Sequence, residues 1–347
     1  MSLRRLARFA PRRTPPLITA FRATKTMSGS KALHLRKLLG LAMFVWLFPS
    51  VGLPAPTSAD RNTCGAPAVG DQTDKINACT RILEDTGDLP GDRALAFTYR
   101  AIAYSQSGDD GKANADFAEA FKTDPNNADI YLGRGLASIL KGRVDEAAPD
   151  VDRALAIDPK SLPALNVSGE LSSLRGDYKV ALNRFDAALA SSPNDIGPLI
   201  YRAVARFYSG SFDGAVSDLI AADQTQAGGA YPVLWLEMFA KRTGASGKFA
   251  KRAERKDAMT WQAPLLQMYL GKVTPAQALD AAHHANPPYT QGQLCASNFF
   301  VAEFFDSNGK TSDAIPLYQA VTHDCLPLAP EQIAARSELK SHGITTP

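Results

Sequence analysis

The four cysteines are the residues whose type and spacing say most about possible chemistry. No two of them form a CxxC pair, and the histidines are not spaced from them as metal ligands, so we do not expect a zinc site. An even number of cysteines in an exported chain favours disulfides, and three pairings are possible. The four residues are Cys64, Cys79, Cys295 and Cys325.

Catalytic chemistry has little support elsewhere in the chain. The adjacent pair His283 and His284 could ligate a metal, but neighbouring helix residues point about 100° apart, and no carboxylate follows at i+3 or i+4. No GxSxG, HExxH, Walker or dinucleotide-binding glycine motif occurs. We therefore expect no catalytic residue, no metal site and no cofactor, and a protein that is not an enzyme.

The net charge separates the first residues from the rest. The 347 residues carry 38 Lys and Arg against 35 Asp and Glu, a net of +3. Residues 1–38 hold ten of the basic residues and no acidic one, so the remainder has 28 basic and 35 acidic residues, a net of −7. Without this leader, nucleic-acid binding driven by positive charge loses its main support, and we expect no nucleic-acid partner.

Residues 1–59 are predicted to be a leader that is removed. The apolar run from Leu38 to Val51 follows basic residues and precedes small ones, which favours a signal-peptidase cut between Ala59 and Asp60. Met27 would place a conventional short basic segment before that run and is the expected true start. The alternatives are a membrane anchor, for which the run is short, and an organellar transit peptide. The expected location is periplasmic or secreted, with no stable membrane span after cleavage.

A repeat of 34 residues predicts the helices that must position the cysteines and the other candidate functional side chains. It runs over residues 94–229 and shows as columns of small residues and prolines. The columns are Gly108, Gly142, Gly176 and Gly210; Ala113, Ala147, Ala181 and Ala215; Ala120, Ala154, Ala188 and Ala222; and Pro125, Pro159 and Pro193. Each period predicts two antiparallel helices, with the glycine ending the first and the alanines allowing close approach of the second.

The first unit matches the tetratricopeptide pattern W-x2-L-G-x2-Y…A-x3-F…P in register. The matching residues are Phe97, Ala101, Tyr104, Ala113, Phe117, Ala120 and Pro125. The chain therefore resembles the tetratricopeptide repeat (TPR) family. This resemblance implies an all-α fold, a right-handed α-solenoid of helix-turn-helix repeats, with four units in residues 94–229.

Both ends of the array are predicted to be degenerate units closed by disulfides. Residues 60–93 form an N-terminal cap in which Cys64 pairs with Cys79. Residues 295–343 form a C-terminal TPR-like unit with a capping helix. There Cys295 begins one helix and Cys325 ends its antiparallel partner, so these two cysteines pair as well.

Residues 230–294 are predicted to be an irregular helical segment, with Thr274 as an N-cap and Pro275 at the first helical position. Residues 261–274 (WQAPLLQMYLGKVT) and 295–305 (CASNFFVAEFF) resemble the C-terminal half of the NlpI-like TPR lipoproteins of bacterial envelopes. This resemblance implies an envelope scaffold that recruits cell-wall hydrolases or a protease. No lipid-attachment cysteine directly follows the apolar run, which departs from that family. The basic run from Lys248 to Lys256 is a solvated linker face or a patch for an anionic partner.

In the TPR family the first helix of each unit lines the concave face, and peptides lie in that groove. Carried to this sequence, the groove-facing positions are mostly apolar. They are Leu132, Leu136, Ile139, Leu140, Glu170, Leu174, Ile200, Val204, Phe207 and Tyr208.

The expected function is a non-enzymatic scaffold or adaptor of the bacterial cell envelope that binds protein or peptide partners in this groove. The sequence is also compatible with two alternatives. One is an accessory subunit or hydrolase with its site in residues 244–292, and the other is a self-associating structural protein.

Overall fold

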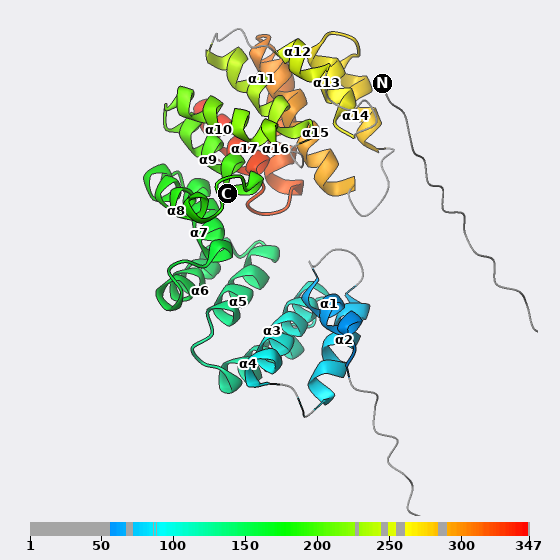
Figure 1. Cartoon of the computed structure of the whole chain (residues 1–347). Helices are drawn as coiled ribbons and strands as arrows, with labels where there is room; N and C mark the ends of the chain where they lie inside the picture. The colour runs from blue at the N-terminus through cyan, green and yellow to red at the C-terminus, as the bar shows by residue number, and fades with distance from the viewer. Residues whose placement is uncertain are drawn as a thin grey trace, which may run out of the picture. The chain divides into compact units, whose positions relative to one another are not determined.

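The computed structural model describes residues 56–66, 72–85, 87, 89–225, 229–243, 249–254, 261–283 and 290–345. These residues form seventeen α-helices and no strand, which confirms the all-α prediction (Figure 1). None of the described helices is both long enough and apolar enough to cross a membrane. The leader prediction concerns residues 1–59, of which 1–55 lie outside the described residues.

Four helical hairpins follow one another at the predicted step of 34 residues, and the two helices of each hairpin pack together. They are α3 (Pro90–Gln106) with α4 (Asp110–Thr123), α5 (Ala128–Leu140) with α6 (Val144–Ile157), α7 (Leu162–Leu174) with α8 (Tyr178–Ser191), and α9 (Ile196–Tyr208) with α10 (Phe212–Gln224).

The glycines of the repeat end the first helix of each unit, as the sequence predicts. Gly108, Gly142, Gly176 and Gly210 have φ values of 83°, 73°, 81° and 85° and end the first helix of their units. A residue without Cβ adopts this left-handed conformation at the lowest cost, so the chain can turn into the second helix there. The alanine columns are buried, which lets the paired helices approach closely.

An ion pair inside three of the four hairpins also follows the 34-residue step, although the columns of small residues do not reveal it. Arg100 binds both carboxylate oxygens of Asp116 at 2.7 and 2.8 Å. The same bidentate pair recurs, sixteen residues apart each time, in the second unit as Arg134–Asp150 and in the fourth as Arg202–Asp218. Each pair fastens a first helix to its second helix through two charge-assisted hydrogen bonds.

The N-terminal cap consists of α1 (Ser58–Gly65) and α2 (Thr73–Glu84), which pack on each other and on α3. The predicted Cys64–Cys79 disulfide joins them, with Cα atoms 4.9 Å apart. Thr57 caps α1: its hydroxyl accepts from the Asp60 amide, and the Asp60 carboxylate accepts from the Thr57 amide. This capping box spans the bond at which signal-peptidase cleavage is predicted.

The helices after the fourth unit begin in register and then change. The first of them, α11 (Tyr231–Thr243), starts 35 residues after α9 and continues the series of first helices. Three short helices follow: α12 (Phe249–Ala253), α13 (Ala263–Tyr269) and α14 (Pro275–His283), the last with the predicted Thr274 cap.

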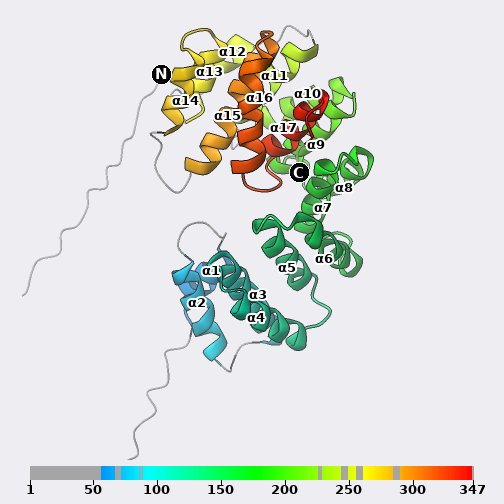
Figure 2. The same cartoon turned by 180° about the vertical axis from the view of Figure 1, so that it is seen from behind.

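The C-terminal unit pairs α15 (Thr290–Ser307) with α16 (Thr311–Asp324), and the predicted Cys295–Cys325 disulfide joins them with Cα atoms 5.3 Å apart. The last helix, α17 (Pro330–Ser341), packs against α16, α15, α9 and α7 (Figures 1 and 2). The C-terminal segment thus returns to the first helices of the third and fourth units.

Candidate partner-binding groove

The groove residues expected from the sequence lie on the first helices α5, α7 and α9, and the structure gives them different environments. Five of them are buried: Leu132, Ile139, Ile200, Val204 and Phe207. Leu136, Glu170, Leu174 and Tyr208 are half-buried, and Leu140 is 39% exposed. Phe207 stacks on Phe239 of α11 with ring centroids 4.0 Å apart. Any partner role of these residues remains a prediction.

The C-terminal segment covers the groove of the third and fourth units. Four tyrosine hydroxyls from α8, α9 and α11 meet polar groups on this segment, over sequence separations of 100 to 159 residues. The contacts are Tyr178 with Ser337 at 3.0 Å, Tyr201 with the Leu328 carbonyl at 3.1 Å, Tyr208 with Glu338 at 2.7 Å, and Tyr231 with Glu331 at 2.5 Å. Burial raises the pKa of Tyr201, Tyr208 and Tyr231 well above the usual value, so these hydroxyls are protonated donors.

Leu328 anchors the turn that leads into α17. Its side chain is buried in the apolar cluster of the second and third units, together with Leu132, Ile139 and Leu165. It is the only described residue other than glycine with a positive φ, at 68°. Its amide donates to Gln332 Oε1 at 2.9 Å, which holds the turn at the start of the helix.

A buried network of charges fixes the other end of α17. The Arg242 guanidinium lies 3.3 Å from Glu303, 3.2 Å from Asp306 and 2.6 Å from Glu338. Tyr318 donates to Glu303 at 2.8 Å, and His342 lies 3.2 Å from Asp306. This network joins α11, α15, α16 and α17 through hydrogen bonds to buried charged groups.

Burial is the largest single cause acting on the pKa of both Glu303 and Arg242. It raises the pKa of Glu303 to about 8, and the nearby Glu338 carboxylate adds to the effect while Arg242 opposes it. For Arg242, burial lowers the pKa, but the carboxylates of Glu303 and Glu338 outweigh burial, so the net pKa is raised and the guanidinium stays charged. One guanidinium thus faces three carboxyl groups.

Asp306, Glu338 and His342 bring their ligating atoms within 4.8 Å of one another, a spacing that could hold a metal ion. Arg242 already binds both carboxylates of this trio, and His342 binds Asp306. A fixed positive charge therefore stands where a cation would bind, and the arrangement is a protein ion-pair network.

The repeat register identifies groove residues that the sequence analysis missed. Leu140, Leu174 and Tyr208 are spaced by 34, and the next step gives Arg242. Likewise, Asn166 and Ser173 on α7 lie 34 residues after Leu132 and Ile139. Arg242, Asn166 and Ser173 all appear when the 34-residue alignment includes polar residues and one further unit.

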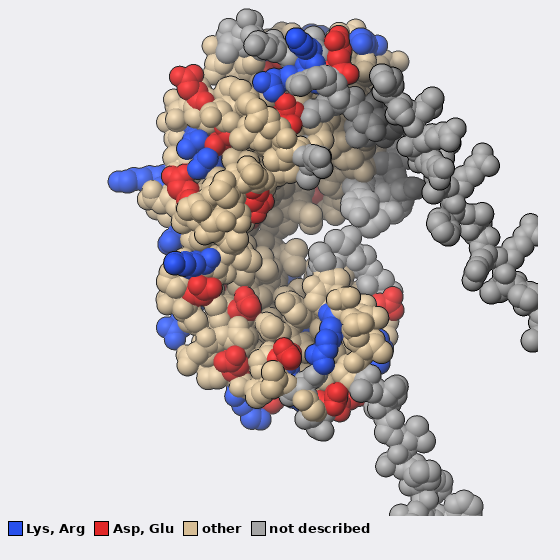
Figure 3. Space-filling view, viewed as in Figure 1, with Lys and Arg blue, Asp and Glu red and all other residues tan. Residues whose placement is uncertain are grey.

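The groove opens beside the second unit. A hollow of about 720 Å³ lies between Leu140 at the end of α5 and the ends of α15 and α16. Leu326, 54% exposed, and Leu294 add apolar surface, and Asn298 of α15 lines the hollow with no hydrogen bond to any described residue. On the face seen in Figure 3, basic and acidic side chains are interspersed and not gathered by sign.

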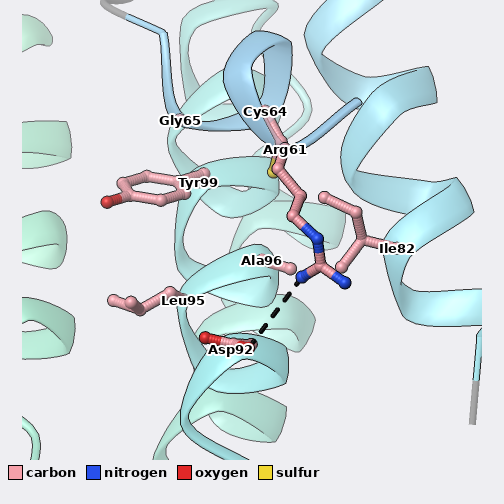
Figure 4. A pocket seen from close by; sticks show the side chains of 8 residues that line it. All are labelled: Arg61, Cys64, Gly65, Ile82, Asp92, Leu95, Ala96 and Tyr99. Atoms are coloured by element: carbon pink, nitrogen blue, oxygen red, sulfur yellow. Dashed lines mark ion pairs between the residues drawn. The ribbon is translucent and has the colours of Figure 1, made fainter. Parts of the chain in front are cut away.

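A smaller hollow of about 140 Å³ lies in the N-terminal cap (Figure 4). Leu95 and Tyr99, one turn apart on α3, border it, and Arg61 of α1 lies 3.9 Å from Asp92. It holds one ion pair and no cluster of titratable groups suited to catalysis, so it extends the apolar surface of the cap.

Several other residues singled out by the sequence lie outside the part of the chain that the structure describes. His284 lies outside the described residues, as do Lys248, Arg255 and Lys256 of the basic run. Within that run, Arg252 binds the buried Asp223 carboxylate at 2.6 Å, so this basic residue has a structural ion pair. All four cysteines are in disulfides.

Comparison with known proteins agrees with the repeat. Residues 100–161 match the family model of the tetratricopeptide repeat. No curated protein matches the chain.

Solved structures similar to this chain include PilF of Pseudomonas aeruginosa, which is 14% identical and matches 65% of this chain and 97% of its own, with a TM-score of 0.46. A tetratricopeptide repeat protein of Parabacteroides merdae is also 14% identical, over 72% of this chain and all of its own, with a TM-score of 0.46. PilW, described as a widely conserved type IV pilus biogenesis factor, is 17% identical over 69% of this chain and 96% of its own, with a TM-score of 0.43.

Proposed function

We propose, from the premise that this chain is a tetratricopeptide repeat protein, that it is a non-enzymatic scaffold of the bacterial cell envelope. In this proposal it binds a protein or peptide segment on the concave side of its first helices. The partner class is that implied by the NlpI-like resemblance, a cell-wall hydrolase or an envelope protease.

One observation carries the choice of binding surface. Within the described groove, the C-terminal segment covers the third and fourth units, while Leu140 and Leu326 remain exposed around the hollow beside the second unit. Exposed apolar side chains gathered at a concave site are typical of interaction surfaces. The Asn298 side-chain amide, which has no hydrogen bond to a described residue, can both donate to and accept from the main chain of a bound segment.

The chemistry of the cysteines supports the proposed compartment. Both disulfides lie within single structural units, and stable disulfides belong to oxidising compartments such as the periplasm. The basic, acid-free residues 1–38 and the apolar run after them support export.

Photo-crosslinking from the hollow tests the proposal. A photoreactive amino acid at Leu140 should give a discrete partner adduct in intact cells. The same residue at Val180, 45% exposed on the second helix α8, is the matched control and should give none. The purified partner should bind the wild-type protein and bind the Leu140→Asp variant about tenfold more weakly. Equal adducts from both positions, or binding unaffected by Leu140→Asp, would refute the proposed surface.

A further inference from the structure

The surface on which α17 packs has the features of a helix-binding site. Glu331 and Glu338, seven residues apart and so on one face of α17, meet Tyr231 and Tyr208 of two successive first helices. Between these acids lie Ala334 and Ala335, both fully buried. A groove typically recognises an amphipathic helix through anchor residues at i and i+7, with small residues between them that allow close contact.

We infer that the groove formed by α7, α9 and α11 is a helix-binding site that α17 occupies within its own chain, and that its external ligand is an amphipathic helix whose carboxylate replaces Glu338 between Tyr208 and Arg242. The external ligand carries two acids seven residues apart, with small residues between them. This inference rests on the proposed function, because it assigns a second partner surface to the same scaffold.

The α7 side of the groove shows that α17 is an incomplete ligand. Asn166 Oδ1 and Ser173 Oγ are buried without a hydrogen-bond partner among the described residues. Glu170, on the same face of α7, has no hydrogen bond or ion pair to any described residue, and burial raises its pKa to about 8. A hollow of about 260 Å³ is lined by Leu174 of α7 and by Ser337 and Ile344 of the C-terminal segment.

These unmet groups define what a better ligand adds. Buried polar atoms without partners are costly, so a helix that places an amide or ammonium donor against Glu170 gains what α17 does not supply. The external ligand therefore combines the acids that bind Tyr208 and Arg242 with a donor on the side that faces α7.

The connection to α17 allows it to leave without unravelling the C-terminal unit. The Cys295–Cys325 disulfide fastens the end of α16 to α15, and only Leu326 to Ala329 separate Cys325 from the first residue of α17. The α15–α16 hairpin thus stays closed when α17 is displaced.

Binding in trans tests the inference on the full chain. The probe is a fluorescein-labelled peptide of residues 328–344, titrated into the wild-type protein and into the Glu338→Ala variant, whose own α17 is weakened. The variant should bind the peptide about tenfold more tightly than the wild type, because the internal competitor has lost its charged contacts. A peptide with Glu338→Ala should bind about tenfold more weakly than the unmodified one. Lys340→Ala, at an exposed position of α17, is the matched control and should behave as the wild type.

Hydrogen exchange of the wild-type protein keeps the test decisive if Glu338→Ala folds poorly. The amides of α17 should exchange faster than those of α16, and added peptide should speed the exchange of α17 alone. Equal protection of the two helices with no effect of peptide would overturn the inference and make α17 a fixed part of the fold. Crosslinking at Leu140 is unaffected by either result, so this inference and the proposed function fail separately.

Discussion

Tyr208 and Arg242 bind the two oxygens of a single carboxylate. The Tyr208 hydroxyl donates to Oε1 of Glu338 at 2.7 Å, and the Arg242 guanidinium lies 2.6 Å from Oε2. The two residues stand 34 apart, so they hold the same position in successive first helices. The repeat thus turns one sequence position into a row of side chains along the groove, and one docked helix can contact several of them.

Phe207 and Leu140 should separate stability from binding. Phe207→Ala should lower the free energy of unfolding by about 3–5 kcal/mol, because it removes a buried ring stacked on Phe239 and leaves a cavity. Leu140→Ala should cost less than about 1 kcal/mol, since Leu140 is partly exposed, and should weaken partner binding. Denaturant unfolding and affinity for the crosslinked partner measure both effects. A Phe207→Ala protein as stable as the wild type would contradict the core position of this ring.

Stability should fall as pH rises from about 4.5 to 8. Burial raises the pKa of Glu170 from 4.5 to about 8, so in this range the native state binds a proton that the unfolded state has released. Stability is then greatest below the unfolded pKa and is lost as pH rises through the folded pKa. Glu303 acts in the same direction. Glu170→Gln should match the wild type near pH 4 and exceed its stability at pH 8, by at most roughly 4 kcal/mol. Melting curves at both pH values decide, and a wild-type protein more stable at pH 8 would refute the assignment.

Arg100→Ala tests the ion pairs inside the hairpins. It should lower the free energy of unfolding by about 3 kcal/mol, because Asp116 would be left buried without its guanidinium. Arg143→Ala is the matched control: its pair with Glu146 is exposed on both sides, so the loss should stay within about 0.5 kcal/mol. Equal effects of the two substitutions, measured by urea unfolding, would show that burial of the pair does not matter.

Both disulfides should contribute to stability. Replacing Cys64 and Cys79 by serine should cost about 3 kcal/mol, and replacing Cys295 and Cys325 about 3–4 kcal/mol, because the second bridge closes a longer loop in the unfolded chain. Non-reducing peptide mapping of the native protein should recover these two linkages. Crossed linkages or free thiols would be inconsistent with the repeat register.

Thr57→Ala tests where the mature chain begins. Cleavage before Asp60 would remove Thr57 and with it the capping box of α1. The substitution should then leave the stability of the secreted protein unchanged, whereas a mature chain that keeps Thr57 should lose about 1 kcal/mol. N-terminal sequencing of the same samples gives the direct answer, and a chain that retains the apolar run would refute the predicted cleavage.

The sequence by itself determined the repeating part of this protein. Gly108 and its equivalents mark helix ends, the alanine columns mark close helix contacts, and both disulfides follow from the register, because each feature depends on residues within one or two units. The Arg–Asp pairs and Arg242 also follow the 34-residue period, so an alignment of the polar residues at this period reveals them.

Only the tertiary structure decided what fills the groove. The contacts of α17 with Tyr178, Tyr208 and Tyr231 join residues 100 to 159 apart, and no period in the sequence relates Glu338 to Tyr208 or Ser337 to Tyr178. Leucines and aromatic residues at the groove positions are compatible with an open peptide-binding surface and equally with a buried interface between helices, because apolar burial is not directional. The path of the chain after Cys325 makes the choice, since it buries Leu328 among side chains of the second and third units and lays α17 on the first helices of the third and fourth units.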